Sequence, residues 1–148
     1  MVEVVPMSLE HLVPVAAIEA ASFPVPWSLQ AFVQELLENS LAEYLVALRN
    51  GEVAGYAGAW VILDEAHVTN VAVRPDLRRL GIGRLLMEKL LERVFFLGAR
   101  RVTLEVRVSN RQAKALYESL GFCTKGVRRG YYEDNKEDAL IMWLELGV

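Results

Sequence analysis

The chain has 148 residues, 53% of them hydrophobic and 24% charged, and its formal net charge is −3 at pH 7. That length suits one compact domain over residues 1–148, which can bury about two thirds of its unfolded surface without metals or disulfides. The negative charge argues against a nucleic-acid-binding protein, and no apolar stretch approaches the roughly 18 residues of a membrane span. The single cysteine excludes an intrachain disulfide and a multi-cysteine metal site. We expect a cytoplasmic protein without a metal cofactor.

The amino-terminal part predicts one strand and two helices. Val2–Val5 is typical of a short strand, and an amphipathic helix follows over Ser8–Ala21. A rigid aromatic loop, residues 23–27, comes next. Ser28 then suits the N-cap of a second helix, because a serine side chain accepts a hydrogen bond from the free amides of a first turn.

The central part predicts three strands. Tyr44–Arg49 and Glu52–Val61 flank Asn50-Gly51, the dipeptide best suited to a tight hairpin, because both of its positions tolerate positive φ. A third strand is predicted over Glu65–Val73 after a short connection.

The carboxyl-terminal half alternates helices and strands. Strict alternation in the first of its strands places Glu105 on the face away from the core. The predicted elements are a helix over Arg84–Leu97 that stops at Gly98, a strand over Arg101–Val108, a helix over Ser109–Leu120, and strands over Phe122–Val127 and Glu137–Glu145. The predicted order is therefore βααβββαβαββ, an α/β fold with a mixed sheet.

The segment Arg78-Arg79-Leu80-Gly81-Ile82-Gly83 joins a strand to a helix and suits a phosphate. Free amides at a helix start and the helix dipole favour an anion, and Arg84 adds a further charge. We predict an anionic, phosphate-bearing cofactor. An ordinary strand-to-helix turn is the alternative. A dinucleotide site is disfavoured because the first glycine of Gly-x-Gly-x-x-Gly is missing.

Three polar side chains are expected near this segment. Asn110 and Tyr117 are seven residues apart, so on one helix they would share a face about 10 Å apart. Glu105 approaches from the polar face of the preceding strand. Together they offer an amide, a phenol and a base.

Five blocks stand out: Asn70-Val71-Ala72-Val73-Arg74-Pro75; Arg78-x-x-Gly81-x-Gly83; Leu104-Glu105-Val106-Arg107-x-Ser109-Asn110; Ala115-Leu116-Tyr117-Glu118-x-x-Gly121-Phe122; and Arg128-x-x-Tyr131-Tyr132 with Glu137-Asp138-Ala139. Together they resemble the GNAT superfamily of acetyl-CoA-dependent N-acetyltransferases. The third block and the tyrosine pair resemble, more narrowly, members that acetylate the N-terminal alanine of ribosomal proteins. The resemblance implies the GNAT fold, a single domain with a mostly antiparallel mixed sheet flanked by helices.

The resemblance also implies a role for each site residue. Glu105 would be the general base, with a raised pKa, and Tyr117 the general acid toward the CoA sulfur. A backbone N–H near Ala72 or Val73 would polarise the thioester carbonyl. The implied cofactor-binding residues are Val71, Ala72 and Val73 with Asn110 and Tyr117 for the pantetheine arm, and Arg78, Arg79, Leu80, Gly81, Ile82, Gly83 and Arg84 for the pyrophosphate.

The acceptor implied by the resemblance is a protein α-amino group, most narrowly the N-terminal alanine of a small-subunit ribosomal protein. A slot for an extended peptide would lie between one wall made of Phe23, Pro24 and Trp27 and another made of Tyr131 and Tyr132. Nearby acidic residues would attract a basic peptide: Asp64, Glu65, Glu133 and Asp134. The other partner expectations are no direct nucleic acid, no membrane, and a monomer or weak dimer.

Each role has a simpler alternative. Glu105 could form only a surface pair with Arg107, and Tyr117 could be a surface aromatic residue. As adjacent strand residues, Tyr131 and Tyr132 would point to opposite faces, so that one of them could belong to the core. His67 alternates with Thr69 and Val71, so it could line the cleft as a second base or be structural.

Cys123 is expected to be buried filler. Two functional alternatives stay open: a GNAT enzyme that acts on a small-molecule amine or a lysine side chain, and a non-catalytic acyl-CoA-binding protein.

Overall fold

The computed structural model describes residues 1–147, and its elements follow the predicted order. They are β1 (Val2–Pro6), η1 (Leu9–His11), α1 (Leu12–Ser22), α2 (Leu29–Glu38), β2 (Ala42–Arg49), β3 (Glu52–Ile62), β4 (Glu65–Val73), η2 (Pro75–Leu77), α3 (Ile82–Phe96), β5 (Arg101–Arg107), α4 (Arg111–Ser119), β6 (Cys123–Arg128) and β7 (Ala139–Glu145), where η marks a 3-10 helix. Across residues 1–147, every helix falls short of the length and apolar character that crossing a membrane would demand.

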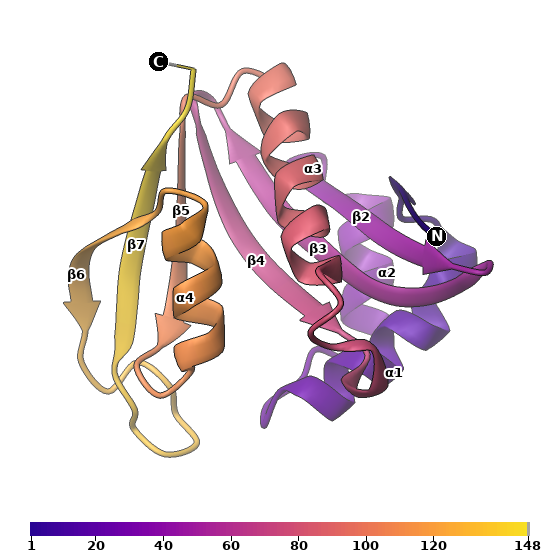
Figure 1. Ribbon diagram of the computed structural model, residues 1–148, viewed down its shortest axis with the longest axis horizontal. Helices are drawn as coiled ribbons and strands as arrows, with labels where there is room; N and C mark the ends of the chain where they lie inside the picture. The colour runs from indigo at the N-terminus through magenta and orange to yellow at the C-terminus, as the bar shows by residue number, and fades with distance from the viewer. Residues whose placement is uncertain (148) are drawn as a thin grey trace.

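The seven strands found in residues 1–147 join one mixed sheet in the order β1-β2-β3-β4-β5-β7-β6. Only the β4–β5 pair is parallel, and the other neighbouring strands are antiparallel. Helices α3 and α4 cover one face of the sheet, and α1 and α2 cover the other (Figure 1). The predicted mixed, mostly antiparallel sheet is confirmed.

Each face of the sheet has its own hydrophobic core. Leu86 and Leu90 of α3 are fully buried on one face, together with Leu104 of β5. On the other face Phe32 of α2 packs edge-on against Tyr56, with ring centroids 5.8 Å apart. Burying one such side chain contributes about 1.5–3 kcal/mol, so the two cores hold the helices on the sheet.

The turn and cap signals account for several element boundaries. Asn50 and Gly51 take φ values of 54° and 80°, as the tight hairpin requires. The Ser28 hydroxyl accepts a hydrogen bond from Ala31 N–H at 3.1 Å, which confirms the predicted cap of α2. The start predicted for α4 is wrong by two residues. Asn110 precedes the helix as its N-cap, with its Oδ1 accepting from Ala113 N–H at 3.2 Å.

A β-bulge in β4 changes which residues share a face. Gly58 of β3 lies opposite Asn70, whereas the next residue, Ala59, lies opposite Val68, so Thr69 is an extra residue. Val68 packs in the α3-side core, whereas Ala72 packs in the α1–α2 core. The expectation that His67 and Val71 share a face is therefore wrong, because a bulge shifts the alternation by one residue.

The close approach of Tyr44 to β3 generates a stability prediction. A Cβ atom at Gly58 would overlap the Tyr44 ring, which is 6% exposed in a packed core. We expect Gly58→Ala to destabilise the fold by about 1–3 kcal/mol, as overpacking does. Denaturant unfolding measures this. Gly126→Ala is the control, because its Cβ would meet Ile141 at an ordinary 3.5 Å; equal stability of the two variants would contradict the prediction.

Candidate active site

The site begins where β4 and β5 part. The parallel pairing covers only Glu65–His67 against Arg101–Thr103. Beyond it β4 stays paired with β3 as far as Val73, and β5 stays paired with β7 as far as Arg107, so the two strands diverge (Figure 1). The inner edge of β4 therefore keeps unpaired backbone groups, which an extended ligand can use.

The backbone direction identifies the free amides on that edge. Arg74 N–H donates to Ala54 on β3 at 2.8 Å. Amides alternate along a strand, so Ala72 also faces β3, whereas Val71 and Val73 face the opening. The structure thus favours Val73 over Ala72 as the free amide. The role of residues 71–73 in cofactor binding stays a prediction.

The start of α3 has the geometry of an anion site. Gly81 is the N-cap, in the left-handed region with φ of 81°, and it has no side chain to cap the helix. The first helical hydrogen bond runs from Leu85 N–H to Gly81 C=O at 3.1 Å. The amides of residues 82–84 therefore lack a helical acceptor, and the helix dipole favours negative charge beside them.

The three arginines beside this helix start have different partners. Arg78 Nη2 donates to Ser22 Oγ at 3.1 Å, which ties this loop to the end of α1. Arg84 Nη1 donates to Ser119 Oγ at 2.7 Å, at the end of α4. Arg79, with φ of 66°, has no side-chain partner among residues 1–147. Its charge is therefore the most available of the three for a phosphate.

Glu105 lies in the middle of β5 with its side chain 13% exposed. Its Oε2 lies 2.7 Å from His67 Nε2, and its Oε1 lies 3.6 Å from Arg128 Nε. The hydrogen bond from His67, then the charges of His67 and Arg128, hold the pKa of Glu105 below its ordinary value although burial opposes this. The expected raised pKa is therefore wrong, because basic partners outweigh burial.

His67 is the residue whose importance the sequence left open. It pairs with Thr103 in the β4–β5 ladder, and Glu105 lies two residues further along the same face of β5. Pairing of these strands makes the two side chains cross-strand diagonal neighbours. The sequence pattern alone did not specify which residues of the two strands lie opposite each other.

Tyr117 projects from α4 with 9% of its surface exposed, and its ring packs against Phe122 at 5.8 Å. Burial, followed by the nearby Tyr132, raises the pKa of Tyr117 to about 12, so its phenol stays protonated at neutral pH. The expectation that Asn110 and Tyr117 lie two turns apart on one helix is wrong. Asn110 is a cap whose Oδ1 accepts from Ala113 N–H, and its amide nitrogen can donate to a ligand.

Tyr131 and Tyr132 lie in the loop between β6 and β7, not in a strand. Their rings pack edge to face, with centroids 5.1 Å apart, so they do not point to opposite faces of a sheet. Tyr131 is 47% exposed, and Tyr132 is half-buried. A loop with two adjacent aromatic rings presents one continuous contact surface.

Arg107 holds this loop from beneath. Its guanidinium lies 3.9 Å from the centre of the Tyr132 ring. It donates to Asp134 at 3.0 Å, to Asn135 at 3.2 Å and to Glu137 at 3.2 Å. Arg107 therefore belongs to the loop network, and the alternative that it pairs with Glu105 is wrong.

The opposite wall connects α1 to α2. Phe23 and Trp27 pack partly into the α1–α2 core, and the Trp27 ring lies 5.4 Å from Phe32. Pro24 is exposed. This connection and the β6–β7 loop both lie at the end of the sheet where β4 and β5 have separated (Figure 1). Their use as walls of a peptide slot stays a prediction.

The surface expectations for Asp64, Glu65 and Cys123 are wrong, whereas attraction of a basic peptide by the exposed Glu133 stays a prediction. Asp64 and Glu65 pair with Arg101 at the start of β5, about 20 Å along that strand from the Arg107 network, so they are remote from the tyrosine loop. Asp134 is engaged by Arg107. Cys123 is exposed, because β6 is an edge strand with little cover.

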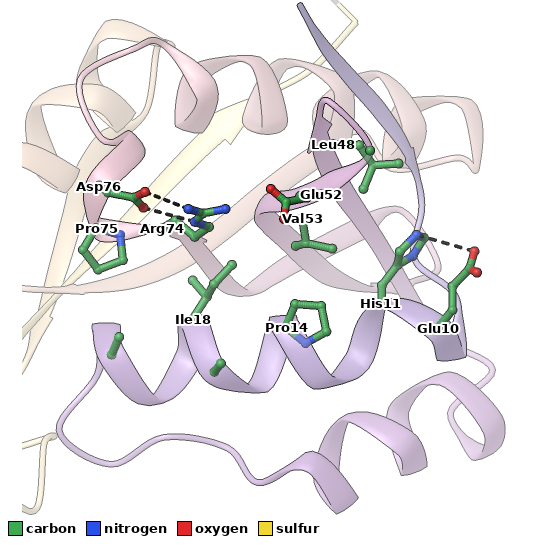
Figure 2. A pocket seen from close by; sticks show the side chains of 13 residues that line it. Glu10, His11, Pro14, Ile18, Leu48, Glu52, Val53, Arg74, Pro75 and Asp76 are labelled. Atoms are coloured by element: carbon green, nitrogen blue, oxygen red, sulfur yellow. Dashed lines mark hydrogen bonds and ion pairs between the residues drawn. The ribbon is translucent and has the colours of Figure 1, made fainter.

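A separate hollow of about 600 Å³ lies between α1, the β2–β3 hairpin and η2. Ile18, Pro14 and Val53 form its apolar floor, and the ion pair between Arg74 and Asp76, 2.7 Å long, forms its rim (Figure 2). It includes neither Glu105 nor Tyr117, so we do not assign it to the reaction.

Residues 12–122 match the acetyltransferase (GNAT) family. The chain belongs to this family. It is therefore an acyltransferase whose cofactor is acetyl-CoA. A relative from Bacillus subtilis (strain 168) is 46% identical over 140 residues, which cover 95% of this chain and 93% of the relative. The [ribosomal protein bS18]-alanine N-acetyltransferase of Escherichia coli (strain K12) is 43% identical over 133 residues, 88% of each chain.

Solved structures agree with this assignment. The crystal structure of the ribosomal-protein-S18-alanine N-acetyltransferase from Escherichia coli matches with a TM-score of 0.91 and 37% identity, covering 100% of this chain and 96% of that one. Arabidopsis thaliana NAA60 in complex with acetyl-CoA matches with a TM-score of 0.89 at 16% identity, covering 99% of each chain. This second likeness concerns the fold alone.

The Arg107 network generates a pH prediction. The hydrogen bonds from Ser109, then from Arg107 and Asn135, lower the pKa of Glu137 to about 2 from an ordinary value of 4.5. Because the pKa of Glu137 is lower in the folded state than in the unfolded state, its ionised carboxylate stabilises the fold fully at pH values above about 4.5. This contribution is lost as the pH falls toward about 2. We expect the melting temperatures of the wild type and Glu137→Gln to differ above pH 5 and to converge on acidification. Glu133→Gln, exposed in the same loop, is the control; a gap that is independent of pH would contradict the prediction.

Proposed function

We propose that this enzyme transfers the acetyl group of acetyl-CoA to the α-amino group of the N-terminal alanine of ribosomal protein bS18, a small-subunit protein. The observation that carries this acceptor is the similarity to the Escherichia coli bS18-alanine N-acetyltransferase over 88% of both chains. The paired tyrosines beside the Glu105–His67 side of the sheet support an extended peptide. We expect a monomer or weak dimer. Because the proposed acceptor is a ribosomal protein, we expect the enzyme to be cytoplasmic and to bind neither nucleic acid nor a membrane directly.

The residues fit the pyrophosphate and the pantetheine arm of the cofactor. The amides of residues 82–84 and the charge of Arg79 would hold the pyrophosphate, while Arg78 and Arg84 shape the loop from either side. The free edge at Val71 and Val73 would hold the pantetheine arm, and the Asn110 amide nitrogen would add a donor. When bound, acetyl-CoA supplies an activated acetyl thioester.

The Glu105–His67 pair is assigned to removing the proton of the acceptor amine. Glu105 alone is a weak base because its pKa is lowered. When His67 is neutral with its proton on Nδ1, a proton that reaches the carboxylate, directly or through a water, can pass through the 2.7 Å contact to the free Nε2, and the resulting imidazolium–carboxylate pair is the state in which the pKa of Glu105 is lowered. The two side chains then act as one base, and Arg128 keeps the carboxylate ionised beforehand.

Tyr117 is assigned to protonating the departing sulfur. Its pKa of about 12 keeps the proton on the phenol at neutral pH, so the hydroxyl can donate to the sulfur as negative charge develops there. The buried ring fixes the direction of the hydroxyl, since α4 and Phe122 hold it.

The acceptor is tested with a peptide that begins with alanine and carries an internal lysine. We expect the free α-amino group to be acetylated and the peptide with a blocked amino terminus to be inert, with the modified residue located by mass spectrometry. Turnover of the blocked peptide would favour a lysine acetyltransferase. In cells that lack the gene, bS18 should lose its N-terminal acetyl group.

The two proton carriers are tested by conservative substitutions. We expect Glu105→Gln and Tyr117→Phe each to lower kcat by about 100-fold, the usual contribution of a proton carrier. Steady-state kinetics at saturating substrates measures this, and kcat/KM of the wild type should fall as the pH is lowered because the base must be free of a proton. The control is Tyr44→Phe, whose hydroxyl bonds Glu35 at 2.8 Å on the α2 side. An unchanged kcat in both variants would contradict the assignment of Glu105 and Tyr117 as proton carriers.

A further inference from the structure

Glu19 of α1 is a buried carboxylate that the mechanism does not use. Its side chain is 2% exposed, and among residues 1–147 only Glu19 and Asn70 are buried polar residues. No lysine, arginine or histidine of the described chain forms an ion pair with Glu19. Burying a lone carboxylate is costly unless several donors satisfy it.

Three donors satisfy Glu19, and they come from three different segments. Oε1 accepts from the Tyr56 hydroxyl of β3, in a short contact, and from Asn70 Nδ2 of β4 at 3.3 Å. Oε2 accepts from the backbone N–H of Trp27 at 2.9 Å. One oxygen is thus bound to the sheet and the other to the α1–α2 connection.

These bonds join the aromatic wall to the strand that faces the cofactor. Asn70 immediately precedes the free edge at residues 71–73 and lies beside the bulge at Thr69. Trp27 belongs to the wall assigned to the peptide. Glu19 is also the residue whose C=O accepts from Phe23 N–H at 3.1 Å, where α1 ends. It therefore holds the connection at both of its ends.

We propose that Glu19 is a positioning residue for the acceptor peptide. By holding Trp27 N–H it fixes the distance between the wall of residues 23–27 and β4, so that a chain end entering along the wall meets the opening between β4 and β5. The inference rests on the proposed function, because it takes the acceptor to be an extended peptide in this slot.

Glu35 supplies a matched comparison for a purely structural role. It too is a carboxylate beneath a helix that receives three hydrogen bonds: from Tyr44 at 2.8 Å, Trp60 at 2.6 Å and Asn39 at 3.0 Å. It joins α2 to β2 and β3 and has no bond to residues 23–28. Its loss should lower stability without changing peptide binding.

Asn70 offers a way to separate charge from geometry. Its Oδ1 is buried and has no partner. In Glu19→Gln the glutamine oxygen can face Trp27 N–H, and its amide can donate to Tyr56 Oη and to Oδ1 of a turned Asn70. We therefore expect the glutamine to rescue the function, because Trp27 N–H keeps its acceptor, whereas only the Tyr56 hydroxyl and the Asn70 amide lose theirs.

The experiment compares Glu19→Ala, Glu19→Gln and Glu35→Ala in the full chain. For Glu19→Ala we expect the KM for the alanine-initiated peptide to rise about tenfold or more, because Trp27 N–H no longer holds residues 23–27 at a fixed distance from β4, with the KM for acetyl-CoA nearly unchanged. Glu19→Gln and Glu35→Ala should keep the peptide KM of the wild type. Hydrogen exchange at Trp27 should accelerate in Glu19→Ala alone.

Unchanged peptide KM and unchanged Trp27 exchange in Glu19→Ala would overturn the proposal. If that variant does not fold, Glu19→Gln is compared with Glu19→Gln/Asn70→Ala, which lacks the carbonyl that lets the glutamine turn; equal peptide KM values would then overturn it. Failure of the proposed function is distinguishable, because the wild type would then not acetylate the peptide at all, while Trp27 exchange still reports on Glu19.

Discussion

The short parallel pairing of β4 and β5 is the constraint on which the rest of the site depends. Because it covers only three residue pairs, the inner edge of β4 keeps free amides, and the polar face of β5 is open beside it. The bulge at Thr69 lies two residues beyond the last pair, where extra twist bends a strand away from its neighbour. The divergence thus brings the free edge of β4, the Glu105–His67 pair and the β6–β7 loop together at one end of the sheet.

Charges around this opening have distinct tasks because their partners differ. Arg79 and the amides of α3 are free to meet an anion, whereas Arg107 is fully engaged beneath the tyrosine loop. Glu105 is kept ionised by its basic neighbours His67 and Arg128, whose effect on its pKa outweighs that of burial. Glu19 and Arg107 have a structural task instead: each ties a loop to the sheet with several hydrogen bonds.

Much of the fold was predictable because local rules and tertiary packing agree. The Asn50-Gly51 hairpin and the strand Glu65–Val73 are found where their turn chemistry and hydrophobic pattern place them. The start of α4 was not predictable from periodicity, since Asn110 can continue a helix or cap it and only the bond to Ala113 decides between them. The face of Val71 was missed for a similar reason, because no sequence signal marked the bulge at Thr69.

By itself, the sequence determined the order of elements, the glycine-containing start of α3 and the family, because these depend on short motifs whose chemistry is local. Only the tertiary structure decided the partners: His67 and Arg128 for Glu105, the β6–β7 loop for Arg107, and Trp27 for Glu19. The physical reason is that a side chain's pKa and orientation depend on groups within a few ångströms of it. Strand register and the bulge, rather than distance along the chain, bring those groups together.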